Sequence, residues 1–386
     1  MIKSHLTGRI AIARIAGIMA AMAEPNPFTE AKRREHVEAA FAVDEVRLAN
    51  RNAGILLEAL RHDVTPVGLH YLLNHFDVPY VADDSWQLAL QGHVSRPMSW
   101  SLADLKALPT RTLRVTMECA GNGRGLLTPR YPSMPWLHEA VGTAEWTGAG
   151  LKHVLERAQL GDDVVEIAFI GADRGFDRGV EHNFGRSLKR ELALGEDVLL
   201  AWAMNGRPLL PQHGFPLRLI VPGWYGMGNV KWLSRIEALP RPYQGFQQAA
   251  GYHYRSAPGL PGTPVTHMRV KALLVPPGIP DWYSRHRLLD AGATEVFGRA
   301  WSGGGIPIAH VEVAINGRWQ QASLDPPQGK FAWQAWRYLW QAQAGDYELA
   351  CRATDANGET QPLEPRWDAG GFGNNAVQRV RVWVRS

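Results

Sequence analysis

Met117-Glu-Cys-Ala-Gly-Asn-Gly-Arg124 is the most informative stretch of the sequence. The apolar residues just ahead of it, Leu113 to Met117, predict a strand that delivers Cys119 into a glycine-rich loop. Glycine lets the backbone approach a ligand closely, and Arg124 supplies a cation that favours a thiolate and attracts an anion. Two functional interpretations follow: a nucleophilic thiolate with a histidine base, or a soft thiolate ligand for a metal. A buried cysteine in a tight turn is the alternative without function.

The composition excludes several classes of protein. The chain has 386 residues, enough for two or three domains, and only two cysteines, Cys119 and Cys351. Without CxxC or zinc-type spacing there is no c-type haem attachment, zinc finger or four-cysteine cluster, and one disulfide is the most that could form. The net charge of +4 has no polybasic run behind it, so we expect no nucleic-acid partner. No apolar stretch is long enough to span a membrane.

The N-terminal region, 1–64, reads as a leader followed by a helical extension over 28–62. Arg9 and Arg14 precede an apolar run, Ile15 to Ala23, which resembles a weak signal peptide. The run is short and has no twin-arginine pair, so we favour an unstructured leader or a start codon assigned too early. This interpretation places a soluble protein in the cytoplasm rather than the periplasm.

The rest of the chain divides by its patterns of apolar residues. Residues 65–245 mix buried β-branched runs (87–90, 113–117, 164–170, 198–201 and 217–221) with short helices at 101–108 and 151–158, which predicts an α+β domain. Residues 246–264 read as a connection. From 265 to 386 the strands alternate, and one ends at Asn316-Gly317, a strong hairpin signal. This pattern predicts an immunoglobulin-like sandwich with Cys351 buried in a strand.

Several further segments, together with the cysteine loop, resemble the sulfite oxidase family of molybdopterin-dependent oxidoreductases. Cys-Ala-Gly-Asn-x-Arg is similar to the molybdenum-ligating loop of sulfite oxidases and eukaryotic nitrate reductases. Other matches follow in the same order from about residue 65 to the end of the chain. They include Asn74-His75, Ala144-Glu-Trp-Thr-Gly148, Phe169-Ile-Gly-Ala-Asp173, Pro211-Gln-His-Gly-Phe-Pro-Leu-Arg218, Val230-Lys-Trp-Leu233, Tyr243-Gln-Gly-Phe246 and Trp333-Gln-Ala-Trp-Arg337.

The resemblance implies a Mo-molybdopterin cofactor ligated by Cys119 and a homodimer formed by the second domain. Unlike the animal enzymes, the sequence has no N-terminal haem domain, so we expect no haem. Arg218 and Lys231 suit a phosphate dianion, and Asp173 suits the N–H groups of a pterin. The resemblance also implies that Tyr243 lies beside the metal oxygens and that Trp136 lines the substrate pocket. The full set of positions that match the family's cofactor-binding residues is Tyr71, Asn74, His75, Asp173, His213, Arg218, Val230 and Lys231.

The chain departs from the family at the substrate. Sulfite oxidases resemble one another in placing three arginines around the oxyanion, and here Arg124 keeps one while Leu73 and Gly370 replace the others. Each lost charged pair weakens binding of a dianion by about 2–5 kcal/mol. We therefore hold two enzymatic hypotheses: oxidation of sulfite to sulfate, or action on a less charged sulfur compound or S-oxide. Either needs an external electron acceptor, such as cytochrome c or oxygen. A cofactor-free binding protein is the third hypothesis.

Overall fold

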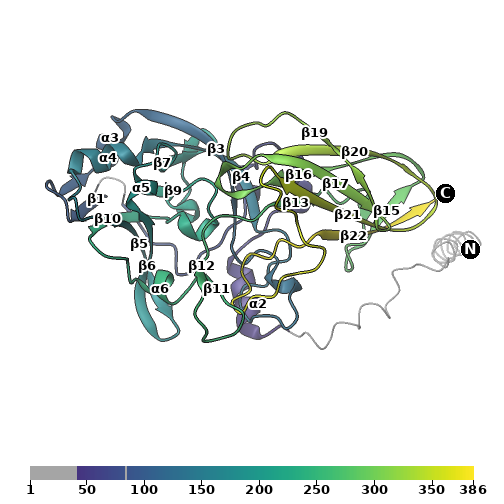
Figure 1. The fold of residues 1–386 in the computed structure, drawn as a ribbon, viewed down its shortest axis with the longest axis horizontal. Helices are drawn as coiled ribbons and strands as arrows, with labels where there is room; N and C mark the ends of the chain where they lie inside the picture. The colour runs from purple at the N-terminus through teal and green to yellow at the C-terminus, as the bar shows by residue number, and fades with distance from the viewer. Residues whose placement is uncertain (1–40, 83–84) are drawn as a thin grey trace, which may run out of the picture.

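The computed structural model describes residues 41–82 and 85–386. Figure 1 shows two lobes, the first carrying β1 to β10 and the second carrying β13 to β22 up to the C-terminus. This division confirms the predicted α+β domain followed by a β domain. The leader expected around Arg9 and Arg14 lies outside the described residues. No helix in the described part of the chain is long and apolar enough to cross a membrane.

The predicted continuous helix over 28–62 is wrong in its described part. Helix α2 (Val43–Arg51) ends at Asn52, whose backbone is extended, and only a 3-10 turn, η3 (Leu57–Arg61), follows. The side chain of Asn52 explains the break, because its Oδ1 accepts a hydrogen bond from the backbone N–H of Asn74 at 2.7 Å. Ala53 then pairs with Leu72. Residues 52 and 53 therefore pair with the extended segment around Asn74 and do not continue the helix.

The first lobe contains one mixed five-stranded sheet that carries Asp173. Its strand order is β2 (Met98–Trp100), β1 (Leu88–Gly92), β10 (Leu233–Leu239), β5 (Glu166–Asp177) and β6 (Val180–Lys189). The register between β5 and β6 shifts between Ile170 and Arg174. A bulge of this kind re-aims side chains, and it falls where Asp173 leaves the regular ladder.

A second sheet in this lobe delivers the cysteine loop. It consists of β3 (Thr110–Glu118), β4 (Val141–Gly150), β7 (Leu199–Met204) and β8 (Arg207–Pro208), with β9 (Arg218–Ile220) also paired to β7. Strand β3 stops at Glu118, one residue before Cys119. The predicted helices are confirmed as α3 (Leu102–Lys106), capped by Ser101, and α4 (Leu151–Ala158). A further short helix, α5 (Arg190–Ala193), follows β6.

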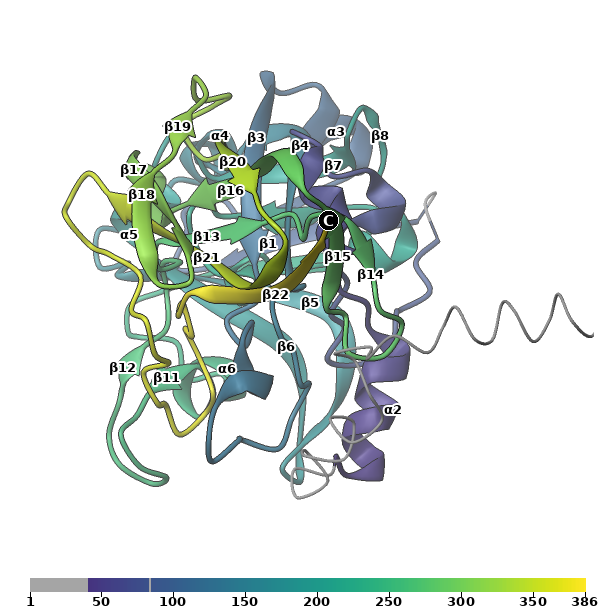
Figure 2. The same ribbon diagram turned by 90° about the vertical axis from the view of Figure 1, so that its right-hand side faces the viewer.

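The second lobe is a β-sandwich, seen end-on in Figure 2. Alternating apolar side chains such as Trp336 and Cys351 fill the space between its two sheets. Asn316 and Gly317 both have positive φ, which confirms the hairpin predicted there. One sheet has the order β13 (Lys271–Leu274), β16 (Gly292–Trp301), β20 (Gln334–Ala342), β19 (Ser323–Leu324). The other has β14 (Ile279–Pro280), β15 (Arg287–Asp290), β22 (Gln378–Arg385), β21 (Gly345–Asp355), β17 (Ile308–Ile315) and β18 (Arg318–Gln321).

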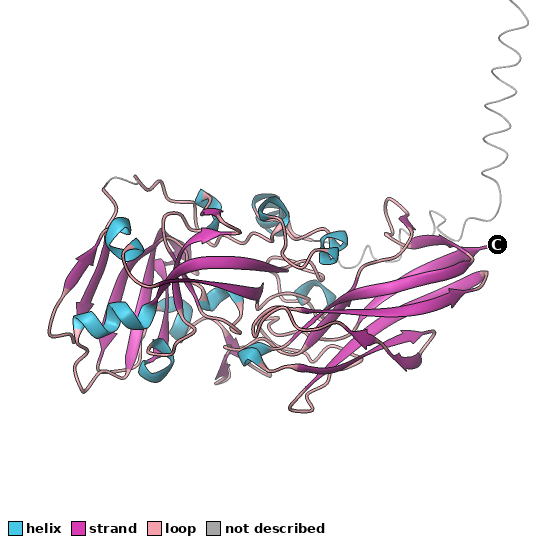
Figure 3. Ribbon diagram, turned by 90° about the horizontal axis from the view of Figure 1, so that it is seen from above, coloured by secondary structure: helices cyan, strands magenta, loops and turns pink. Residues whose placement is uncertain are grey.

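The segment predicted as a plain connection has structure of its own. It contains helix α6 (Phe246–Ala249) and a small hairpin of β11 (His253–Tyr254) and β12 (Thr263–Pro264). Between them the chain returns to the centre of the molecule and buries Tyr252. Figure 3 shows the helices confined to the first lobe and the junction. The remaining turns there are 3-10: η4 (Val67–Leu69), η5 (Arg124–Leu126), η6 (Pro211–His213), η7 (Gly226–Gly228) and η8 (Gly303–Gly305).

Candidate active site

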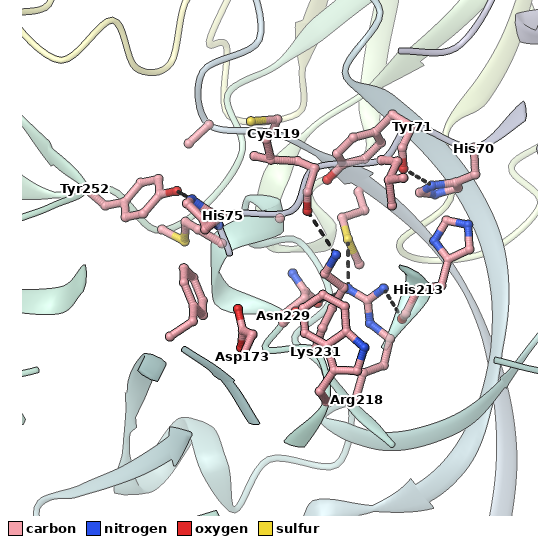
Figure 4. A pocket seen from close by; sticks show the side chains of 18 residues that line it. His70, Tyr71, His75, Cys119, Asp173, His213, Arg218, Asn229, Lys231 and Tyr252 are labelled. Carbon is pink, nitrogen blue, oxygen red and sulfur yellow. Dashed lines mark hydrogen bonds between the residues drawn. The ribbon is translucent and has the colours of Figure 1, made fainter. Parts of the chain in front are cut away.

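A cavity of about 670 Å³ lies at the end of β3 and gathers most of the residues that sequence reasoning selected. Figure 4 shows Cys119 and Tyr71 on one side, with Asp173, Lys231 and Arg218 across from them. A larger groove continues from it, and Leu73, His75, Cys119 and Tyr252 line both spaces. The residues predicted to bind the cofactor that line the first cavity are Tyr71, His75, Asp173, His213, Arg218 and Lys231.

The remaining predicted residues fall in different places. Asn74 and Arg124 line the groove rather than the first cavity. Val230 is fully buried and lines neither space, although its neighbours Asn229 and Lys231 line the cavity. Trp136 is buried beside Cys119, and a hydrogen bond from its indole N–H to the sulfur lowers the pKa of that thiol.

The cysteine loop is held from the other domain. The backbone N–H of Gly373 donates to Ala120 O at 2.8 Å, and the Asn374 side chain donates to Gly123 O, also at 2.8 Å. Gly123 has a φ of +86°, where a side chain would be strained, and a Cβ there would collide with Asn374. The glycine therefore allows both the turn and the close approach of the C-terminal segment.

Glu118, immediately before Cys119, is the centre of a buried polar network between the domains. Its carboxylate accepts from Lys271 Nζ at 2.8 Å, from Trp301 Nε1 at 3.0 Å and from Asn122 Nδ2 at 3.0 Å. Lys271 also donates to Asn374 O at 3.0 Å. Every one of these residues is buried. The network fixes the end of β3 relative to the second lobe, and sequence reasoning did not detect it.

The surroundings of Cys119 favour a metal ligand over a nucleophile. Burial raises the pKa of the thiol, while the charge of Arg124 lowers it. A nucleophilic cysteine needs a hydrogen-bonded base. The nearby His75 is instead hydrogen-bonded to Tyr252, and His70 to the Tyr71 carbonyl. The described residues contain no cluster of three or more metal-binding side chains, so a metal at Cys119 has to arrive with other ligands of its own.

Arg218 is a buried cation and Lys231 a partly buried one, and neither has a carboxylate within ion-pair distance among residues 41–82 and 85–386. Arg218 donates to His213 O at 3.1 Å and to Asn229 O at 3.2 Å, and its Nε has no partner. Lys231 donates to the Leu73 carbonyl at 3.0 Å and to the Asn74 side chain. Burial lowers the pKa of Arg218 to about 10 and also lowers that of Lys231. Because unpaired buried charge is costly, this pair fits a bound phosphate.

His70 is a cavity residue that sequence reasoning missed. Its Nδ1 lies 3.0 Å from the Tyr71 carbonyl and must donate to it, which leaves Nε2 as an acceptor without a partner in the described residues. Burial lowers the pKa of His70 to about 4 and that of His213 to about 3, so both rings are neutral at pH 7. The Nε2 side of the ring is buried against Gly142 of β4, so His70 forms part of the cavity wall beside Tyr71 without presenting this nitrogen to a ligand. Its position beside Tyr71 was the only available signal.

Asp173 provides a carboxyl group on the opposite wall. Burial raises its pKa to about 6, and the charge of Lys231 opposes that rise. The bulge in β5 places it at the cavity, where ring and amino N–H groups of a pterin could donate to it. Together, the two cations without a carboxylate partner and this carboxyl group match the polar atoms of a pterin phosphate.

The tyrosine at the cavity is Tyr252, and the expectation for Tyr243 does not match its placement. Tyr252 lines both spaces, its hydroxyl lies 2.7 Å from His75 Nε2, and burial, with a smaller contribution from the nearby Cys119, raises its pKa. Tyr243 lines neither space, and its backbone N–H donates to Glu166 at 2.9 Å. Helix α6 lies between the two tyrosines and carries the chain back to the cavity, a turn that the local motif does not reveal.

Comparison with known proteins agrees with this geometry. Residues 75–247 match the family model of the oxidoreductase molybdopterin binding domain, and 265–385 match the Mo-co oxidoreductase dimerisation domain. The chain is 33% identical to mitochondrial sulfite oxidase of Homo sapiens over 83% of its own length and 62% of that protein. It is 33% identical to sulfite oxidase of Gallus gallus, covering 82% of this chain and 72% of that one.

Nitrate reductase [NADH] 2 of Phaseolus vulgaris is also similar, at 30% identity over 88% of this chain and 42% of that protein. Among solved structures, the sulfane dehydrogenase SoxCD of Paracoccus pantotrophus shares the fold. Its TM-score is 0.73 at 22% identity, with 94% of this chain and 96% of that one covered. The chain belongs to the sulfite oxidase family of molybdopterin-dependent oxidoreductases. Its cofactor is Mo-molybdopterin. The chain spans about 62% of the length of the human relative.

The buried histidines predict how the cofactor-free protein responds to acid. Because the folded-state pKa values of His70 and His213 lie below 6.5, the unfolded chain takes up protons first as the pH falls. Stability should therefore decline from about pH 6.5 towards pH 4. Asp173 acts in the opposite sense between its two pKa values, about 6 folded and 3.8 unfolded. Urea unfolding at pH 7.5 and pH 5 should show the decline. It should be smaller in His213→Asn and larger in Asp173→Asn, and an unchanged slope in both variants would contradict the assignment.

Proposed function

We propose that this chain oxidises sulfite to sulfate by oxygen-atom transfer at a molybdenum centre ligated by Cys119, and passes the electrons to an external acceptor. The observation that supports it best is the shared position of Cys119 and Arg124. Both line the groove, and the charge of Arg124 lowers the pKa of the thiol. When bound, the molybdenum cofactor supplies two-electron redox chemistry, and the protein supplies binding, orientation and charge.

Each polar residue of the cavity has a role in this proposal. Arg218 and Lys231 bind the phosphate, whose negative charge compensates two cations that otherwise stay buried and unpaired. The Asp173 carboxyl group accepts hydrogen bonds from the pterin, and His70 and Tyr71 form the wall of the cavity. His75, Asn74 and His213 surround these groups. Val230 positions its neighbours through the backbone, because its carbonyl accepts from Leu219 N–H at 2.8 Å.

Tyr252 and His75 form the proton-handling pair. Burial lowers the pKa of His75 to about 4, so a neutral imidazole shares a hydrogen bond of 2.7 Å with the Tyr252 hydroxyl. This bond aims the tyrosine ring along the wall shared by the cavity and the groove. A proton released near Cys119 therefore meets an ordered hydroxyl rather than bulk water. Trp136 directs its indole N–H at the same thiol, where it favours the thiolate that ligates the metal.

The second lobe is proposed to form a homodimer. Its match to a dimerisation domain motivates this assignment, and two-fold symmetry is the usual arrangement of soluble homo-oligomers. We also propose that the electrons leave to an external acceptor. A cytochrome or another one-electron carrier fits, and so does oxygen.

A second candidate is a sulfur compound with less charge than sulfite, or an S-oxide. The two positions where family resemblance places further arginines support it. Leu73 lies on the wall shared by the cavity and the groove, and Gly370 lies in the groove with its carbonyl accepting from Arg124 Nε at 3.2 Å. Neither side chain can pair with a second negative charge. An apolar residue at such a position selects against a dianion.

Kinetics of the molybdenum-loaded protein test the first candidate. We expect about one molybdenum per chain and turnover of sulfite with a dye acceptor. Arg124→Met should raise the KM for sulfite about thirtyfold or more, because one side of a desolvated ion pair is removed. Leu73→Arg should lower that KM. Arg379→Gln, which removes an exposed arginine of the second lobe, is the control and should leave KM unchanged. An Arg124→Met variant with the parent KM would refute the role of this cation.

A further inference from the structure

The groove beside Cys119 is lined by aromatic rings. It spans about 1980 Å³, a volume that includes space open to solvent. Five aromatic side chains line it, and Phe176 at its outer end is 70% exposed. The rings that line the groove are Phe76, Tyr131, Phe176, Tyr252 and Phe372. Because Tyr252 and Leu73 also line the inner cavity, this apolar wall runs up to the reacting centre.

One cation is fixed at the inner end of the groove. The Arg124 guanidinium lies 5.2 Å from the centre of the Phe372 ring and 5.8 Å from that of Tyr131. Its Nε donates to Gly370 O and its Nη1 to Met134 O at 3.4 Å. An arginine has more N–H groups than these two carbonyls use. Rings and carbonyls therefore hold Arg124 in place while N–H groups remain for one anionic partner.

The other charges of the groove do not add a second cation at that point. Arg178 is 3.4 Å from Asp177, which balances it. Arg255 belongs to the loop beside Pro258 and Leu260, and it is Arg124 whose charge acts on Cys119. A further cation, Arg186, lies 5.4 Å from the centre of the Tyr252 ring and donates to Gln247 O, but it does not line the groove. Among the residues that line it, the inner end of the groove thus offers one positive charge, an apolar Leu73 and a wall of rings. That combination matches a monoanion with an organic substituent better than a small dianion.

We propose that the substrate is an organic sulfinate, R–SO₂⁻, with an apolar or aromatic R group. This inference rests on the proposed function, in its second candidate. A sulfinate is sulfite with one oxygen replaced by carbon. It keeps the sulfur lone pair and two oxygens, has a single charge for Arg124, and carries an apolar group for the rings. The sulfonate product keeps the C–S bond.

The reaction balances with the parts already named. One S–O bond forms on the sulfur, with the oxygen supplied by water, and the sulfur loses two electrons. Two protons are released, and the electrons leave singly to the external one-electron acceptor. Tyr252 and His75 lie where the protons appear, and Leu73 faces the organic group rather than a third oxygen. Sulfite would leave the space at Leu73 unfilled.

The test compares three probes on the molybdenum-loaded full chain with ferricyanide as acceptor: sulfite, methanesulfinate and benzenesulfinate. We expect kcat/KM for benzenesulfinate to exceed that for methanesulfinate by about tenfold or more, because the ring is buried against aromatic side chains. Benzenesulfinate should also exceed sulfite. Tyr131→Ser should reduce the ratio of benzenesulfinate to methanesulfinate, and Leu73→Arg should shift preference towards sulfite. Tyr131 is 42% exposed, so its loss leaves the core intact.

A measurement without turnover complements the kinetics. Benzenesulfonate, the product, should bind the protein in calorimetry, and Arg124→Met should weaken that binding about tenfold or more. Sulfite turnover together with failure of both sulfinates and no benzenesulfonate binding would overturn the sulfinate assignment and leave the oxidase function standing. If the loaded protein oxidises none of the three probes, the proposed function falls and the sulfinate assignment falls with it.

Discussion

Cys119→Ser should lose turnover completely, by about a thousandfold or more, while the protein keeps its fold. A serine oxygen is a poor substitute for a soft thiolate ligand. The backbone of the loop is held by hydrogen bonds that do not involve the thiol, from Gly373 to Ala120 and from Asn374 to Gly123. The urea midpoint of the cofactor-free protein should therefore change little. Steady-state kinetics measures the loss of turnover, pterin content shows whether the cofactor is still bound, and urea unfolding checks that the fold is retained.

The matched control is the other cysteine. Cys351→Ser places the same hydroxyl in a fully buried strand of the sandwich, far from the cavity. It should cost about 1–3 kcal/mol of stability if the hydroxyl finds no partner, yet leave kcat and KM at parent values. The two substitutions thus separate chemistry from stability. Parent-level turnover in Cys119→Ser would refute the ligand assignment.

Lys271→Met should be among the most destabilising single changes in the described chain. It leaves the Glu118 carboxylate buried with only the neutral donors Trp301 and Asn122. Breaking a buried pair by removing one partner costs about 3–5 kcal/mol. We expect that loss in the free energy of urea unfolding, and a lower molybdenum content, because Glu118 is adjacent to Cys119.

Two further variants test whether the loss in Lys271→Met comes from the uncompensated charge of Glu118. Lys271→Met combined with Glu118→Gln should recover part of the loss, since the uncompensated charge is gone. Lys330→Met removes an exposed lysine that lies 2.9 Å from Asp197 and should cost no more than about 1 kcal/mol. Equal losses in the free energy of unfolding for Lys271→Met and Lys330→Met would show that the buried pair stabilises the protein no more than an exposed pair does.

Much of the fold followed from local patterns. The alternating strands around Asn316-Gly317 and the helix at 151–158 formed as predicted, because neighbouring residues decide such elements. The ordered family motifs also selected residues that the fold brings together in one cavity, although their roles stay predictions. The continuous helix expected over 28–62 did not form in its described part, because Asn52 and Ala53 bind a segment twenty residues away.

Other features depend on contacts that a local reading does not reveal. Tyr252 reaches the cavity because α6 turns the chain back, which the motif at Tyr243 does not reveal, and the role predicted for Tyr243 stays a prediction. The ion pair of Glu118 with Lys271 joins positions that are far apart in sequence. Asp173 faces the cavity because of a shift in register between two strands. Each depends on long-range pairing, for which a single sequence carries little information.

The C-terminal segment is hydrogen-bonded to the cysteine loop, so a lobe of this protein cannot simply be replaced by the same lobe of a relative. Gly370 and Phe372 form part of the groove, and Asn374 fixes the turn beside Cys119, so the second lobe helps to choose the substrate. A chimaera that combined this first lobe with a related second lobe would inherit a hybrid groove. Substrate preference would then evolve as a shared property of both lobes, and substitutions on opposite sides of the junction should change together.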